Sequence, residues 1–133
     1  MPKQDCPELA WPWNRQMLAG LTLIALAGLG KMGAELNPAN VNSSLHFISS
    51  LGIILGNVGM ILVGRAFLGK VRWISSLSLL LGGIGLVGFL SFLIFSDIGV
   101  GGLLERIGSY PIIAWSSVMG VYFILCWRNS RLE

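Results

Sequence analysis

Four apolar stretches, each long enough or nearly long enough to cross a bilayer, occupy most of this 133-residue chain. They cover residues 17–33, 46–69, 73–98 and 110–127. About 20 apolar residues in a helix, each rising about 1.5 Å, cross a hydrocarbon layer of roughly 30 Å. The pattern therefore predicts an all-α, polytopic integral membrane protein folded as a four-helix bundle.

The composition excludes a soluble fold of this size. Charged residues make up 11% of the chain, against about 25% in soluble domains, and the mean hydropathy is +0.76. A soluble chain needs enough polar surface to cover one core, and this chain has too little. Because no stripe of Lys and Arg with interleaved aromatic residues is present, nucleic-acid binding is not expected.

The basic residues lie mostly on one side of the predicted spans. Four spans place both termini on the side that holds seven of the nine Lys and Arg residues: Lys3, Arg15, Arg65, Lys70, Arg72, Arg128 and Arg131. The positive-inside rule then predicts that both termini are cytoplasmic and that the protein resides in the cell (inner) membrane. The expected parts are a cytoplasmic interfacial segment (1–16), a transmembrane domain (17–127) and a basic cytoplasmic tail (128–133).

Glycines recur along the two central spans. Those expected to pack helices are Gly52, Gly56, Gly59, Gly82 and Gly85. In lipid, glycine lets two helix backbones approach closely. The connection at 70–72 is short, which makes these spans antiparallel neighbours. We expect the glycines to pack helices within the four-span unit, with a dimerisation face as the alternative.

Most polar side chains near the spans collect at the predicted outer ends. The candidate ligand-binding residues are His46, Asn57, Glu105, Arg106 and Tyr110, and the same layer holds Lys31, Glu35 and Asp97. An ionisable or amide side chain is costly in lipid unless it faces protein or water. Their convergence predicts a polar cavity that opens to the outside.

Each candidate also has a simpler explanation. His46 can cap its own helix, and Asn57 can form a hydrogen bond between helices. Glu105 and Arg106 can be interfacial charges, or can pair with Lys31 or Glu35. One histidine with scattered carboxylates is too few for a metal or haem site, so no cofactor is expected.

Two loops and one tryptophan carry further expectations. In the outer loop at 34–45, Ser43 or Ser44 is expected to cap a helix that begins near residue 45. The segment 97–109 is expected to contain a separate short interfacial helix. Trp115 is expected to anchor the outer interface or to pack against other helices.

Three short segments carry a resemblance to a known family. Residues 38–46 (PANVNSSLH), 56–57 (GN) and 105–111 (ERIGSYP) resemble a large prokaryotic membrane family known as domain of unknown function number nine hundred and ninety-eight. The resemblance covers residues 18–125, which correspond to the later four spans of the usual six-span unit. Members usually have an acid where this chain has Ala39. The resemblance implies a membrane fold and no specific activity.

The leading functional hypothesis is a membrane protein of binding or interaction type, either a subunit of a membrane assembly or a homo-oligomer. Its partners would be the bilayer and other membrane subunits or a second copy of itself. The alternative is a transporter, or a protein that handles lipid or a small ligand in the outer cavity. A membrane enzyme, with His46 as the acid–base group and Glu105 as its partner, is disfavoured because no nucleophile or metal set accompanies them.

Overall fold

The computed structural model describes residues 12–96 and 99–130, and all regular structure in these ranges is helical. Four helices in it are long and apolar enough to cross a membrane: Arg15–Leu36, Ser43–Ala66, Arg72–Phe95 and Gly101–Arg128. The predicted all-α, four-span bundle is therefore confirmed. Lys3, Asp97 and Arg131, on which part of the charge and polar-layer argument depends, lie outside the described residues.

Asparagine side chains cap the first two helices. In α1 (Arg15–Leu36), the Asn14 side chain accepts a hydrogen bond from the Met17 N–H at 2.8 Å. In α2 (Ser43–Ser50), the Asn42 side chain accepts one from the Leu45 N–H at 3.0 Å. The predicted serine cap was therefore wrong. Asn42 already lies in a non-helical conformation that places its carboxamide over the first turn, so the helix begins at Ser43.

The second span is interrupted once, at Leu51, which separates α2 from α3 (Gly52–Ala66). Leu51 keeps a right-handed helical conformation, with φ −59° and ψ −22°, so the two helices form one span of 24 residues. Just before the break, the Ser50 hydroxyl donates to the His46 carbonyl at 2.8 Å. A serine that bonds back to this carbonyl competes with the backbone and often bends a helix.

Two glycines with positive φ permit the remaining turns. Gly69, with φ +76°, precedes α4 (Arg72–Phe95), and Gly99, with φ +80°, precedes α5 (Gly101–Ser130). The prediction of a separate interfacial helix at 97–109 was wrong. Instead α5 is continuous over 30 residues, including Pro111, and starts at Gly101 rather than at 110.

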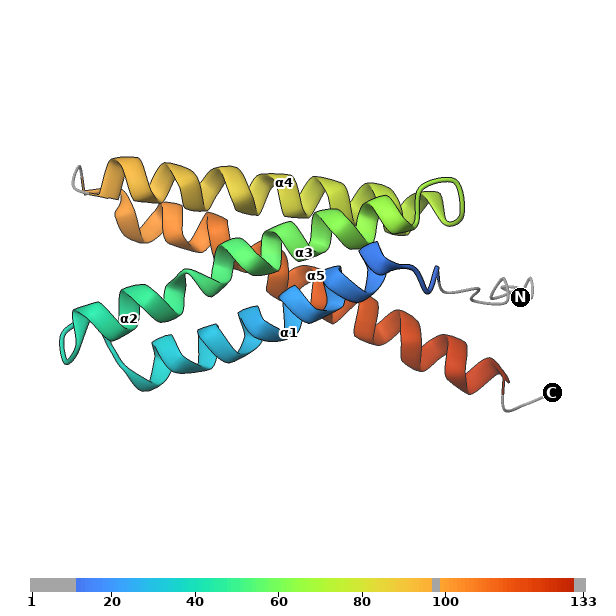
Figure 1. Cartoon of the computed structure of the whole chain (residues 1–133), viewed down its shortest axis with the longest axis horizontal. Coiled ribbons are helices and arrows are strands. Elements are labelled where there is room, and N and C mark those ends of the chain that lie inside the picture. Colours follow the sequence, from blue (N-terminus) through green and yellow to red (C-terminus); the bar gives the residue numbers. More distant parts are fainter. Residues whose placement is uncertain (1–11, 97–98, 131–133) are drawn as a thin grey trace.

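The helix α3 lies at the centre of the bundle. It packs against α1 on one side and α4 on the other, while α2 lies against α1 (Figure 1). The first part of α5 runs beside α4, and α5 then crosses α3. Neighbouring spans are thus antiparallel.

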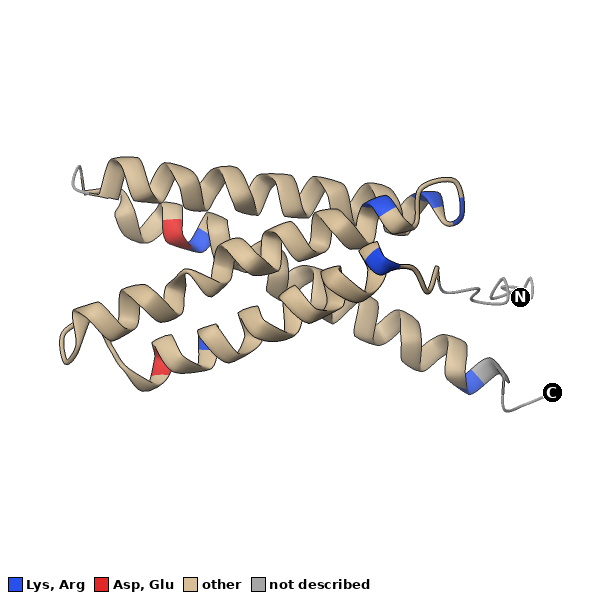
Figure 2. Cartoon of the chain, in the orientation of Figure 1, with Lys and Arg blue, Asp and Glu red and all other residues tan. Residues whose placement is uncertain are grey.

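Large apolar side chains fill one end of this bundle. A buried cluster lies where α1 and α4 begin and α3 ends, and it includes Met17, Met60, Val63, Phe67, Ile74, Trp115 and Met119. Figure 2 shows that Lys and Arg gather at this same end. We call it the basic end; its described charges are Arg15, Arg65, Lys70, Arg72 and Arg128. The described acids, Glu35 and Glu105, both lie toward the opposite end.

Candidate functional site

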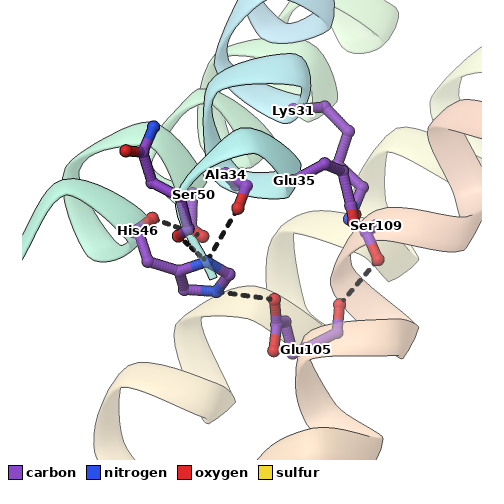
Figure 3. Close-up of polar contacts among 8 residues, drawn as sticks. Lys31, Ala34, Glu35, His46, Ser50, Glu105 and Ser109 are labelled. Carbon is purple, nitrogen blue, oxygen red and sulfur yellow. Dashed lines mark hydrogen bonds and ion pairs between the residues drawn. The ribbon is translucent and has the colours of Figure 1, made fainter. Parts of the chain in front are cut away.

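His46 joins the end of α1 to α2. Its half-buried ring places Nδ1 3.1 Å from the Ala34 carbonyl and 3.1 Å from the Asn37 carbonyl (Figure 3). Both partners only accept hydrogen bonds, so these two contacts require a proton on Nδ1. The ring therefore satisfies the Ala34 carbonyl, one of the last four carbonyls of α1, which lack a partner within the helix.

The opposite edge of the His46 ring points toward α5. Its Nε2 atom lies 4.0 Å from Oε1 of Glu105, and both side chains are about 30% exposed. The hydroxyl of Ser109, one turn further along α5, donates to the Glu105 carbonyl at 3.0 Å. His46 and Glu105 thus bring together α1, α2 and α5 at the end of the bundle opposite the basic end.

The remaining charges of the layer are arranged differently. Lys31 pairs with Glu35 at 2.7 Å, one turn along α1, and both side chains are exposed. Arg106 forms no ion pair with any residue that the structure describes, and it lies on the exposed face of α5. Tyr110, one turn further, is 58% exposed. Among the described residues, no three His, Cys, Asp or Glu side chains come together at a distance suited to a metal ion.

Asn57 lies inside the bundle rather than on an opening. It is fully buried, and its Nδ2 donates to the Ile53 carbonyl at 3.0 Å and to the Gly108 carbonyl at 2.9 Å. Gly108 follows Ile107, whose carbonyl loses its helical donor because Pro111 has no N–H. A polar side chain from a neighbouring helix commonly supports such a turn within a membrane. The geometry favours the structural role of Asn57.

The Oδ1 atom of Asn57 receives no hydrogen bond from the described residues. It faces Gly85 of α4, where a Cβ atom would overlap it. The Cα–H of a glycine is a weak donor to such an oxygen. Three helices therefore meet closely at this one amide.

The five glycines expected to pack helices all lie against the chain's own atoms. A Cβ at Gly59 would lie 2.7 Å from the Gly20 carbonyl oxygen, and a Cβ at Gly56 would lie 2.6 Å from Ile112. The nearest neighbours of the remaining three are Gly30 for Gly52, Ile61 for Gly82 and Asn57 for Gly85. Contacts within the chain occupy these faces, so they offer no room for a partner helix.

Two buried polar contacts were not anticipated. Trp115 is 6% exposed, and its Nε1 donates to the Ser78 hydroxyl at 2.7 Å. Ser75, one turn earlier in α4, donates to the Gly64 carbonyl at 2.9 Å. Trp115 packs within the core, about 21 Å along α5 from Gly101, so the outer-interface location was wrong and the packing role was right. The serines in the otherwise apolar α4 were the sequence feature that could have indicated these buried hydrogen bonds.

A groove runs along the surface between α4 and the first part of α5. Its volume is about 550 Å³, and it is lined by Leu79, Leu80, Gly83, Ile84, Val87, Gly88, Ser91, Leu104 and Ile107. None of the five candidate ligand-binding residues lines it. The groove is nearly all apolar, so it is open to lipid or to another protein rather than to water.

Gly83 forms part of the floor of this groove. No atom of the described chain lies within 4 Å of the position where its Cβ would be. The other three glycines of α4, which are Gly82, Gly85 and Gly88, all have neighbours closer than 3 Å at that position. Gly83 therefore differs from them in having an open side.

Comparison with known proteins yields no match to a family model, to a curated protein or to a solved structure. The family resemblance of residues 38–46, 56–57 and 105–111 therefore has no support from these comparisons. The assignment of four membrane-spanning helices therefore rests on the chain's own sequence and structure.

Proposed function

We propose that this membrane protein is of binding type and takes a transmembrane helix of another protein chain into the α4–α5 groove. The observation that carries the proposal is the open side of Gly83, in a groove of about 550 Å³. A helix with a small residue at its surface can be approached closely, and close approach is the main source of helix association in lipid.

Most other glycines of the two central spans are already covered. Those of α3, and three of the four in α4, contact the chain itself, while the open helical glycines elsewhere, Gly28, Gly102 and Gly120, do not line the groove. A partner helix that needs a glycine notch on α4 therefore has Gly83 available. The hypothesis that the central glycines form the contact with a partner is replaced by one that uses a different face of α4.

The orientation of the protein is part of the proposal. Because Arg15, Arg65, Lys70, Arg72 and Arg128 share the basic end, that end would face the cytoplasm of a prokaryotic inner membrane. The groove would then span the middle of the bilayer, because Leu79 and Gly83 lie in the half of α4 nearer the basic end and Val87 lies in the other half. The resemblance to the family named above remains a hypothesis and adds no activity to this proposal.

The test is native mass spectrometry of the protein released from its own membrane. Wild-type chain is compared with Gly83→Phe, which fills the groove, and with Gly28→Phe. Gly28 of α1 is a matched control because its Cβ position also has no atom within 4 Å, but it lies outside the groove. We expect Gly83→Phe to remove a bound protein chain that wild type and Gly28→Phe both retain.

Two results would contradict the proposal. One is an assembly of unchanged mass in Gly83→Phe. The other is a wild-type chain that carries no protein partner and instead carries a lipid-sized component that Gly83→Phe removes. The second result would favour the alternative function, in which the groove handles lipid.

A further inference from the structure

We infer that His46 and Glu105 form a proton-dependent contact that holds α2 against α5. The contact is held when the His46 ring carries two protons, and it weakens when the ring loses the proton at Nε2. Acidic pH therefore closes the end of the bundle opposite the basic end, and alkaline pH loosens it. This device does not depend on what the α4–α5 groove binds.

The hydrogen bonds of the His46 ring determine which nitrogen carries its first proton. Nδ1 lies 3.1 Å from the carbonyl oxygens of both Ala34 and Asn37, and a carbonyl oxygen only accepts hydrogen bonds. A neutral ring has a single N–H, so in this geometry the proton is on Nδ1 and Nε2 presents a lone pair. Nε2 is therefore the ring atom that gains or loses a proton.

The Nε2 atom faces a second acceptor. Oε1 of Glu105 lies 4.0 Å from it (Figure 3), and an ionised carboxylate only accepts hydrogen bonds. With a neutral His46 ring, two acceptors face each other and do not attract. When Nε2 takes up a proton, it becomes a donor on a positively charged ring, and the same two side chains attract. One proton therefore decides whether the contact forms.

The other charges at this end of the bundle are paired or turned away. Besides His46 and Glu105, the described ionisable residues in this half of the bundle are Lys31, Glu35, Arg106 and Tyr110. Lys31 and Glu35 pair at 2.7 Å, although Glu35 also interacts electrostatically with His46. Arg106 and Tyr110 lie on the exposed face of α5. Histidine is the side chain whose charge ordinarily changes between pH 5 and 8, so His46 is the group that switches in this range.

The position of α2 lets this contact control the end of the bundle. α2 packs against α1 and continues into α3, and among the described residues its backbone does not closely approach that of α4 or α5. The span is interrupted at Leu51, directly after α2, and the Ser50 hydroxyl bonds back to the His46 carbonyl at 2.8 Å. Such an interruption is a place where the first part of a helix can move relative to the rest.

Nuclear magnetic resonance of the ring nitrogens tests the proton positions. His46 is the one histidine of the sequence, so nitrogen-15 labelling of histidine, in a chain purified without a histidine tag, reports this ring alone. We expect two protonated nitrogens at pH 5 and a neutral ring with its proton on Nδ1 at pH 8. A proton on Nε2 at pH 8, or no change between the two pH values, would overturn the inference.

Distances between two spin labels test the movement. The labels are attached at Ser44→Cys on α2 and Leu103→Cys on α5, two exposed positions, in a chain that also carries Cys6→Ser and Cys126→Ser. We expect the ratio of the short-distance to the long-distance population in nanodiscs to be about two- to fivefold larger at pH 5 than at pH 8. The change is of this size because the ion pair is partly exposed.

Matched variants separate the pair from its surroundings. His46→Gln and Glu105→Gln are each expected to remove the pH dependence of the distance ratio. Arg106→Gln, which removes the charge next to Glu105 on the exposed face, is expected to keep it. A wild-type ratio that is equal at the two pH values, or a pH dependence that persists in Glu105→Gln, would contradict the inference. Gly83→Phe should also keep the pH dependence, so the inference and the proposed function fail separately.

Discussion

The two sides of α4 differ in what occupies the space beside a glycine. On the inner side, Gly82, Gly85 and Gly88 are covered by Asn57, Ile61, Ile107 and Gly108. On the groove side, Gly83 has no atom of the described chain within 4 Å. The same helix therefore carries glycines in two environments. Atoms of the chain fill the space beside the inner glycines, and none fills the space beside Gly83.

This difference suggests that the inner side of α4 contributes to folding and the groove side to binding. In lipid no hydrophobic force pushes helices together, so a notch is useful only where another helix enters it and gains van der Waals contacts. On the inner side that helix belongs to the chain itself. On the groove side it would have to come from elsewhere, and the following predictions test whether the two sides behave so differently.

The largest effect is expected on the inner side, at Gly85. Gly85→Ala places a Cβ atom on the buried amide of Asn57, which is fixed to Ile53 and Gly108 by hydrogen bonds. Overpacking of a fixed core of this kind costs about 3 kcal/mol of unfolding free energy. Denaturant unfolding in mixed micelles measures it. A value within about 0.5 kcal/mol of wild type would mean that the inner face is loosely packed.

The contact between Trp115 and Ser78 is expected to have a smaller effect. Ser78→Ala leaves the buried indole N–H without its acceptor, and hydrogen bonds between membrane helices contribute about 0.6–1 kcal/mol. A double-mutant cycle with Trp115→Phe should give a coupling energy of that size. Ser117→Ala is the control, since its exposed hydroxyl bonds only within α5. A coupling energy near zero would mean that the hydrogen bond between Trp115 and Ser78 does not stabilise the fold.

The pair formed by His46 and Glu105 should contribute less again. Its atoms are 4.0 Å apart and both side chains are partly exposed, so the coupling energy is expected to stay below about 1 kcal/mol. A cycle of His46→Gln and Glu105→Gln measures it, with Arg106→Gln as an unpaired neighbour for comparison. A coupling energy of several kcal/mol would show that the polar contacts around His46, rather than the packing of α4, dominate stability.

The smallest effect on folding is expected at the groove. Gly83→Ala adds a methyl group into open space and improves helix propensity, so the unfolding free energy should stay unchanged or rise by up to about 1 kcal/mol. Denaturant unfolding in mixed micelles measures this change as well. A loss comparable to that of Gly85→Ala would show that the two sides of α4 are alike.

Much of this fold follows from local sequence properties. The number of spans depends on apolar length, which the sequence states directly, and the turn at 70–72 fixes α3 and α4 as neighbours. The start of α5 did not follow, because the segment 97–109 was expected to hold a separate interfacial helix, whereas α5 runs from Gly101 through Pro111 without a break. Support for the Pro111 turn comes from Asn57, on a different helix, and local patterns do not report such a contact.

The candidate site was only partly predictable for a related reason. Glu105 and Arg106 are adjacent in sequence, but one residue turns a helix by about 100°, so Glu105 faces His46 while Arg106 faces outward. The groove was missed because Gly82 and Gly83 look alike in sequence. Only the positions of α3 and α5 decide which of these glycines is covered.

The most direct measurement is an electron cryo-microscopy map of the protein in nanodiscs made from its native membrane. The account predicts a transmembrane helix of another protein chain seated along Leu79, Gly83 and Val87. A groove filled only by lipid tails, or a partner helix bound to another face of the bundle, would contradict it.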